Sequence, residues 1–299
     1  MLNAAIFIIL CIIWGSTWLA IKIGLEGSPP FLGAGFRFGI SAAFLLLIAV
    51  ISRRKIFAFG EKWPQVLVAA FLIYPIPYSL VYWGSQYIET GMAAVLFAAM
   101  PFFVAILAHL FIPRERLTFL KVLGMIIGFA GIFIIFGDNL GAEKQFGVLG
   151  MAAIVLSSFF SSSGTIISKI HFRDIDPLSL TVVQSAIGCL ILTAVGLIAE
   201  PISSYNTDPK TVGSLLYLGI FGTALAFTLY FYVLKKMEAT KLATIAFITP
   251  VVALLLGVMI RNERFDPLSV VGSAMVILGV FVVVAGDNLL RRRAVHSRS

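Results

Sequence analysis

Charged residues are scarce in this sequence. Only 12% of its 299 residues are Asp, Glu, Lys or Arg, whereas soluble proteins carry about 25%. Hydrophobic residues make up 60% of the chain, well above the share found in soluble domains. A soluble domain is therefore excluded, and the composition predicts an integral membrane protein.

Cysteine and histidine are also rare, with two and three residues respectively. Cys11 and Cys189 fall inside apolar stretches, where neither suits a disulfide framework or a metal site. A membrane enzyme needs clustered His, Asp, Cys or Lys side chains near one face. We therefore predict no enzymatic activity, no catalytic residues, no metal site and no cofactor. A channel is disfavoured too, because its pore would need rings of charged or carbonyl groups.

Acidic residues are missing from the interior of the apolar stretches, since all fourteen Asp and Glu fall in loops or at predicted helix ends. Carriers driven by protons or sodium usually bury a carboxylate near the middle of the membrane, where it binds the coupling ion. His109, near one end of its stretch, is the one candidate proton carrier inside a predicted span. The sequence therefore predicts transport without tight proton coupling, by a uniporter or an exchanger.

Long apolar runs are what the sequence has in abundance. Each run is close to the 20 or so residues that cross a hydrocarbon core of about 30 Å. The connections between them are short and leave no room for a soluble domain. The ten predicted spans are residues 3–25, 31–52, 64–87, 91–112, 119–137, 147–170, 177–199, 211–235, 239–260 and 267–289.

The net charge of +8 reflects how the basic residues are distributed. If the N-terminus is cytoplasmic and the ten spans alternate, sixteen of the 22 Lys and Arg residues lie on the cytoplasmic side, as the positive-inside rule requires. We therefore predict a plasma-membrane protein with both termini cytoplasmic and a basic tail at 291–299. Nucleic acid is not an expected partner, whereas the lipid bilayer is.

The chain repeats itself after half of its length. The segment that begins at Met100-Pro101 and ends in Gly-Asp-Asn-Leu at residue 140 returns at Thr249-Pro250, ending in the same four residues at 289. Because each half has five spans, an odd number, the second half must enter the membrane from the opposite side. We expect a first repeat at 1–137, a linker at 138–146 and a second repeat at 147–290.

The order and spacing of several short motifs resemble the drug/metabolite transporter superfamily, in its ten-helix EamA-type branch. These motifs are Trp14-Gly15-Ser16-Thr17, Pro29-Pro30 followed by Arg37-Phe38, Ala93-Ala94 to Pro101, Glu115-Arg116-Leu117, and in the second half Thr249-Pro250 with Glu263-Arg264. The resemblance implies an all-α integral membrane protein with ten transmembrane helices, arranged as two inverted five-helix repeats around a central cavity. It also implies export of amino acids, other small metabolites or drugs by alternating access.

Arg37 is the strongest candidate for substrate binding, because charges deep inside a span are rare and usually functional. Its guanidinium could pair with a substrate carboxylate. Alternatively, the side chain reaches the lipid headgroups or pins its helix to a neighbour. Gln184 stands at the equivalent position of the second repeat, so only one half supplies this charge.

Three further groups are candidates for lining the cavity. Trp14, Ser16 and Thr17 in the first span, with Ser163 as a counterpart, could face substrate or could serve helix packing. The tyrosine stripe that includes Tyr78 and Tyr82 has Phe227 and Phe231 as counterparts; these rings could form a pocket or simply pack. Pro101 and Pro250 interrupt matching spans in the two halves, as at transporter binding sites, or they form static kinks.

These candidates predict a substrate that is anionic or zwitterionic, because the one charge well inside a span is positive. We expect a transporter that exports amino acids or related solutes by alternating access, with a small-molecule substrate as its partner. The alternative is a proton-coupled exporter of drugs or other amphiphilic compounds. The sequence leaves open whether the protein is a monomer or a homodimer.

Overall fold

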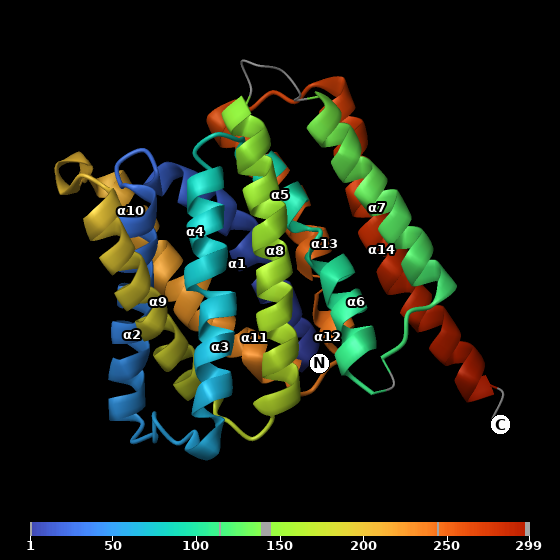
Figure 1. Cartoon of the computed structure of the whole chain (residues 1–299), viewed down its shortest axis with the longest axis horizontal. Coiled ribbons are helices and arrows are strands. Elements are labelled where there is room, and N and C mark those ends of the chain that lie inside the picture. Colours follow the sequence, from blue (N-terminus) through green and yellow to red (C-terminus); the bar gives the residue numbers. More distant parts are fainter. Residues whose placement is uncertain (1, 114, 139–144, 244, 297–299) are drawn as a thin grey trace.

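A computed structural model of the chain describes residues 2–296 except 114, 139–144 and 244 (Figure 1). The side chains of 2–4, 138, 145, 240, 241, 247 and 284–296 are not described either. Most of the expected linker and the end of the expected basic tail therefore lie outside the described residues.

Helices account for nearly all of the described chain, and each predicted span corresponds to one helix or to consecutive helical segments. The longer elements are α1 (Leu2–Gly24), α2 (Pro30–Ile51), α3 (Trp63–Ile73), α4 (Pro75–Gly84), α5 (Thr90–Phe97), α6 (Met100–Phe111), α7 (Phe119–Asp138), α8 (Gln145–His171), α9 (Pro177–Ala199), α10 (Pro209–Gly219), α11 (Ala226–Leu234), α12 (Ala239–Leu242), α13 (Ile245–Arg261) and α14 (Pro267–His296).

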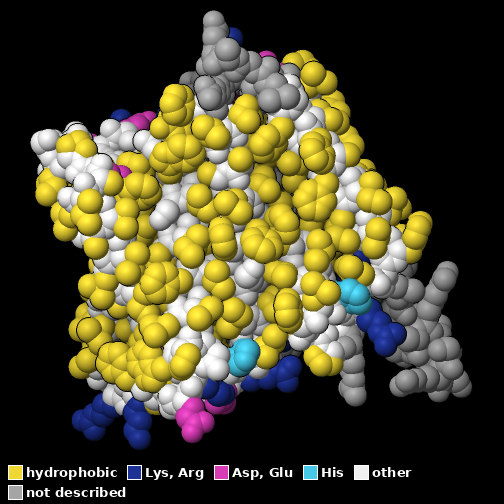
Figure 2. Space-filling view, in the orientation of Figure 1, with side chains coloured by type: hydrophobic (Ala, Val, Ile, Leu, Met, Phe, Trp, Pro, Cys, Tyr) yellow, Lys and Arg dark blue, Asp and Glu magenta, His cyan; other side chains and the backbone are white. Residues whose placement is uncertain are grey.

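Eight of the spans are helical segments long and apolar enough to cross a bilayer, and two shorter apolar helices, Ile248–Arg261 and Pro267–Val283, complete the set among the described residues. The protein is therefore an all-α integral membrane protein, as predicted. Its outer face agrees, since hydrophobic side chains cover the visible surface between the two ends of the helices (Figure 2). Phe119 and Phe133, for example, are 79% and 77% exposed, which suits contact with lipid.

The two halves run in opposite directions through the molecule (Figure 1). The corner between α6 and α7 lies at the lower end in this view, whereas its repeat counterpart, the corner between α13 and α14, lies at the upper end. We call these ends the lower side and the upper side. This arrangement confirms the inverted repeat that the odd number of spans predicted.

Two long helix pairs, each joining the repeats, hold the bundle together. α2 packs along α9, and α7 packs along α14. Both contacts depend on glycine: a Cβ atom at Gly35 would lie 2.4 Å from the hydroxyl of Thr193, and one at Gly279 would lie 2.5 Å from the carbonyl oxygen of Gly124. Small residues allow helices to approach this closely in a membrane, where packing drives association. We call these pairs the seams.

The third helix of each repeat is interrupted at equivalent places. In the first half, α3 ends at Ile73 and α4 starts at Pro75, because proline cannot continue the hydrogen-bond ladder. In the second half, α10 and α11 are joined by a π-helical segment, Ile220–Leu225. Pro75 and Pro77 mark the first interruption in the sequence, whereas the second contains no proline.

Each repeat ties its first helix to the end of its third helix through a lysine. Lys22 Nζ donates to the carbonyl oxygens of Ser85 at 2.7 Å and Ile88 at 2.6 Å. Lys169, its repeat counterpart, donates to Leu234 at 2.6 Å and to Met237. The bonds to Ser85 and Leu234 satisfy carbonyl groups at helix C-termini, which a helix leaves without partners, and the bonds to Ile88 and Met237 hold the connections that follow. The upper and lower sides therefore carry the same internal clamp.

Candidate functional site

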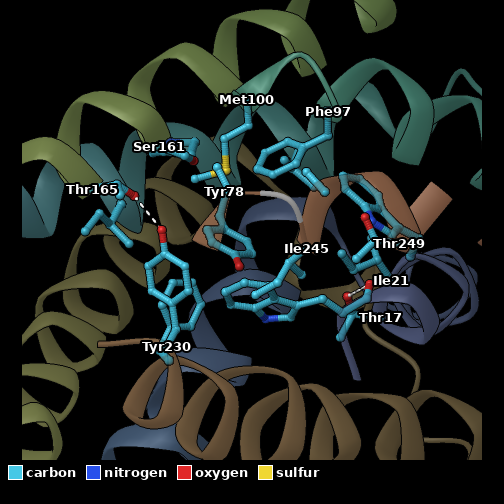
Figure 3. Close-up of a pocket in the computed structure, with 18 of the residues that line it drawn as sticks. Thr17, Ile21, Tyr78, Phe97, Met100, Ser161, Thr165, Tyr230, Ile245 and Thr249 are labelled. Atoms are coloured by element: carbon cyan, nitrogen blue, oxygen red, sulfur yellow. Dashed lines mark hydrogen bonds between the residues drawn. The ribbon is translucent and has the colours of Figure 1, made fainter. Parts of the chain in front are cut away.

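A cavity of about 90 Å³ lies in the interior of the bundle (Figure 3). Its walls come from both repeats, mainly from α1, α4, α8, α11 and α13, and from the interruptions in the fourth and ninth spans. The lining residues are Trp14, Thr17, Trp18, Ile21, Arg37, Ile73, Pro77, Tyr78, Val81, Phe97, Met100, Ser161, Thr165, Phe227, Tyr230, Leu242, Ala243, Ile245, Ala246 and Thr249.

Arg37 is the charged member of this lining, and its side chain is almost fully buried, at 1% exposure. Its Nε donates to the hydroxyl of Thr223 at 2.8 Å, and its Nη2 donates to the carbonyl oxygen of Gly222 at 3.3 Å. Both acceptors belong to the π-helical segment. Because a π turn leaves the regular ladder, it can present such groups, and these turns are frequent at functional sites.

The remaining nitrogen of Arg37, Nη1, is buried and has no hydrogen-bond partner. The guanidinium lies 4.7 Å from the centre of the Tyr78 ring, a cation–π distance. Ion pairs found in the described part of the chain, such as Arg54–Asp176 and Arg261–Glu26, lie near the helix ends and do not include Arg37. Arg37 is thus a buried cation surrounded by neutral groups, with the hydroxyls of Tyr78 and Tyr82 close by, and its Nη1 makes no direct hydrogen bond of normal geometry.

Aromatic rings form much of the cavity wall next to Arg37. The Trp14 ring lies 5.4 Å from the Phe227 ring and 5.2 Å from the Tyr230 ring, measured between centroids. Trp14 Nε1 also donates to the carbonyl oxygen of Gly222, at 3.3 Å. The Tyr230 and Thr165 hydroxyls are hydrogen-bonded at 3.2 Å (Figure 3). The wall is therefore largely apolar, with its polar groups fixed by neighbours.

Five of the residues proposed from the sequence line this cavity together: Trp14, Thr17, Arg37, Tyr78 and Phe227. They come from α1, α2, α4 and α11, so the fold gathers residues that are more than 200 positions apart. Whether they contact substrate stays a prediction.

The other proposed residues lie outside the cavity lining. Ser16 and Ser163 donate to carbonyl oxygens of their own helices, at Ile13 and Phe159, and Ser16 also bonds the Tyr217 hydroxyl at 2.6 Å. This matches the packing alternative that the sequence left open for these serines.

Tyr82 is buried beside Arg37, behind the cavity lining. The remaining four are buried elsewhere in the bundle: Gln184, Phe231, Pro101 and Pro250. The hydroxyl of Tyr82 and both amide atoms of Gln184 have no hydrogen-bond partner. Pro101 stands at the start of α6, directly after an interruption of the fourth span, and Pro250 lies inside α13. These two prolines therefore act on helix shape rather than on the cavity wall in this state, and any contact with substrate stays a prediction.

Several lining residues were not among the proposed site residues. Tyr230 is three residues from Phe227 and so shares its helix face, whereas the sequence favoured Phe231, four residues away. Thr165 and Ser161 could have been found as the repeat counterparts of Trp18 and Trp14. The remaining additions, such as Met100, carry no signal that separates them from ordinary packing residues.

The described residues contain no group of three or more His, Cys, Asp or Glu side chains that could hold a metal ion. The site is instead an interior cavity at the junction of two inverted five-helix repeats, which is the architecture of a secondary transporter.

The EamA-like transporter family matches both halves of the chain, at residues 2–137 and 148–285, and the protein belongs to this family. It is a multi-pass membrane transporter, not an enzyme. The chain is 28% identical to the uncharacterized transporter YoaV of Bacillus subtilis, over 91% of this chain and 92% of the relative. It is 30% identical to an uncharacterized transporter of Archaeoglobus fulgidus, over 91% and 94% of the two chains.

A third relative is the uncharacterized inner membrane transporter YedA of Escherichia coli, which is 27% identical over 96% of this chain and 92% of its own. One solved crystal structure superposes with a TM-score of 0.73, covering 95% of this chain and 97% of the other. At 18% identity, this likeness shows a shared fold.

Proposed function

We propose that the protein exports amino acids or related zwitterionic or anionic solutes by alternating access, and that Arg37 binds the substrate's carboxylate. The observation that carries this proposal is the state of Arg37. It is the charged side chain of the described cavity lining, it is buried, and Nη1 lacks a partner. A planar guanidinium matches the geometry of a carboxylate.

The energetics favour an anion at this place. A buried charge is expensive unless it is paired and its hydrogen bonds are satisfied. Two of the Arg37 nitrogens donate hydrogen bonds to neutral acceptors, the Thr223 hydroxyl and the Gly222 carbonyl oxygen. An anion would supply both the missing hydrogen-bond acceptor and the missing opposite charge, so binding would relieve an unfavourable state of the empty protein.

The cavity must widen for this to happen. Its volume of about 90 Å³ equals that of roughly three water molecules, whereas small-molecule pockets usually measure about 300–1,000 Å³. Alternating access supplies such a change, because one repeat moves against the other around the site. The aromatic rings of Trp14, Phe227 and Tyr230 would then contact the rest of the solute.

Transport without tight proton coupling is the mode that this site supports. The described lining contains no carboxylate that could carry a proton through the cycle. A proton-coupled exporter of amphiphilic drugs remains the alternative, because an aromatic wall also suits such compounds. A cationic drug, however, would face an unneutralised guanidinium at close range, and this repulsion favours the anionic or zwitterionic solute.

We also propose that the protein resides in the plasma membrane with its lower side facing the cytoplasm. Lys and Arg side chains gather along the lower edge of the molecule (Figure 2), where Arg54 and Lys62 pair with Asp176 and Asp174. This distribution follows the positive-inside rule. Both termini would then be cytoplasmic.

Counterflow in proteoliposomes tests the proposed function. Proteoliposomes that contain the purified protein are loaded with unlabelled amino acids, and the uptake of each of a panel of labelled amino acids is measured without a pH gradient. We expect accumulation of at least one amino acid, lost in Arg37→Ala and kept in Arg54→Ala, which removes an exposed arginine. No accumulation across the panel would exclude amino acids as substrates. Equal activity of wild type and Arg37→Ala would show that Arg37 is structural.

A further inference from the structure

Glu263 makes an unusual contact between the two repeats. It lies at the corner between α13 and α14, on the upper side (Figure 1). Its carboxylate accepts hydrogen bonds from the backbone N–H groups of Thr90 at 3.0 Å and Gly91 at 3.2 Å, the first two residues of α5. The side chain is only 7% exposed. A carboxylate of the second repeat therefore caps a helix of the first.

This cap is well built. A carboxylate at a helix N-terminus is stabilised by the helix dipole and by charge-assisted hydrogen bonds. Glu89 occupies the N-cap position itself, but its side chain makes no capping hydrogen bond. Glu263 caps the helix instead. A Cβ atom at Gly257 would lie 2.3 Å from Glu263 Oε2, and one at Gly91 would lie 2.5 Å from Leu254. The glycine at 91 therefore lets α5 and α13 approach closely, and the glycine at 257 leaves room for the Glu263 carboxylate within its own repeat.

The location of the cap relates it to the cavity. α5 contributes Phe97 to the cavity wall, and α13 contributes Ile245, Ala246 and Thr249. Glu263 joins these same two helices near their upper ends, so its contact lies at the upper end of the space between them.

The lysine clamps within each repeat have a different character. The clamps of Lys22 and Lys169 act within one repeat and are formed on the upper and lower sides at the same time. Contacts present on both sides in one state belong to the fixed framework. In a carrier with inverted repeats, it is the contacts between the repeats, next to the cavity, that must break when one side opens.

We propose that Glu263 is a latch that holds the upper side of the cavity closed and releases the N-terminus of α5 when that side opens. This inference rests on the alternating access of the proposed function, but not on the identity of the substrate. Replacing Glu263 by glutamine leaves one neutral acceptor oxygen where the carboxylate has two, so the closed state loses stability and the open state gains population.

Thiol labelling from one side tests the latch. The parent chain carries Cys11→Ala, Cys189→Ala and Ser161→Cys, which puts a single thiol in the cavity wall. A membrane-impermeant methanethiosulfonate reagent is applied to vesicles of each orientation. Ser203→Cys, in the exposed loop between α9 and α10, identifies the upper side. We expect Glu263→Gln to raise the labelling rate from the upper side by about tenfold, the effect of one lost charge-assisted hydrogen bond.

Glu200→Gln is the matched control. The Glu200 carboxylate accepts from the backbone N–H groups of Phe31 at 2.7 Å and Leu32 at 2.8 Å, so it also caps a helix of the other repeat. It does so at the end of the seam between α2 and α9 rather than between helices that line the cavity. We expect this variant to label at the parent rate.

Labelling of Glu263→Gln at the parent rate, or equal increases in both variants, would overturn the latch. If Glu263→Gln does not fold, Glu263→Asp, which keeps the charge but is one methylene shorter, is measured in the same way with the same expectation. The assay needs no substrate. A failed counterflow experiment with normal latch behaviour would therefore reject the proposed substrate alone, and the reverse outcome would reject the latch alone.

Discussion

Replacing Thr223 by valine should destabilise the protein more than removing the charge of Arg37 itself. The Thr223 hydroxyl accepts from Arg37 Nε at 2.8 Å and donates to the carbonyl oxygen of Leu218 at 2.9 Å. Valine has nearly the same shape but neither function. Because Nη1 already lacks a partner, Thr223→Val leaves a buried cation with two unpaired nitrogens.

The expected loss is about 1.5–3 kcal/mol, the value of a hydrogen bond to a charged group. For a chain of this size it corresponds to roughly 3–10 °C in Tm. Arg37→Met should change Tm by less than this, because it removes the desolvation penalty of the charge together with its hydrogen bonds. In the Arg37→Met background, Thr223→Val loses only its bond to Leu218, about 0.5–1.5 kcal/mol.

Thermal unfolding in detergent of the wild type, Thr223→Val, Arg37→Met and the double variant completes this double-mutant cycle. Thr223→Ser, which keeps the hydroxyl, should stay close to the wild type. An equal loss of Tm for Thr223→Val in both backgrounds would show that Thr223 does not stabilise the charge of Arg37, and a lower Tm for Arg37→Met than for Thr223→Val would contradict the predicted order. In the second case Arg37 would be an anchor of the fold rather than a charge kept for a ligand.

Three further predictions concern the scaffold. Gly279→Leu should lower the free energy of unfolding by at least about 3 kcal/mol or abolish folding, because a Cβ atom at this position would lie 2.5 Å from the backbone of Gly124 and 2.6 Å from that of Gly128. Gly137→Leu faces open space and should fold normally, as measured by size-exclusion chromatography. Lys22→Met and Lys169→Met should lower Tm by similar amounts, and a large inequality would contradict equivalent clamps. Burial, then the charge of Glu263, raises the pKa of Glu89. The folded state therefore holds this proton more tightly than the unfolded state, and stability falls as pH rises through the raised pKa. Glu89→Gln should raise Tm at neutral pH but not in acid, and an unchanged pH profile would count against this.

Much of the fold could be predicted because the bilayer leaves few choices. Apolar runs of about 20 residues fix the spans, and the pairing of Pro101 with Pro250 fixes the repeat. An odd number of spans in each half then requires the inversion. Arg37 stood out for a related reason, since a charge inside a span is rare enough to be noticed without any structural information.

The details of the site were harder to predict. The π-helical segment contains no proline, so nothing local marks it; its acceptors matter only because Arg37 reaches them from a helix far away in sequence. Tyr230 was missed because a stripe with a spacing of four was assumed along the eighth span, whereas Phe227 and Tyr230 share their face at a spacing of three. The role of Glu263 was equally hidden, since its partners are backbone groups of the other repeat.

The measurement that most directly tests the account compares a transported solute with its carboxamide analogue as competitors of counterflow, in wild type and in Arg37→Gln. If Arg37 binds the carboxylate, the carboxamide should compete at least tenfold more weakly than the acid in the wild type. In Arg37→Gln the two compounds should compete almost equally well, because neither can then pair with the arginine. The same ratio in both proteins would contradict the central claim, since the carboxylate would then be recognised somewhere other than at Arg37.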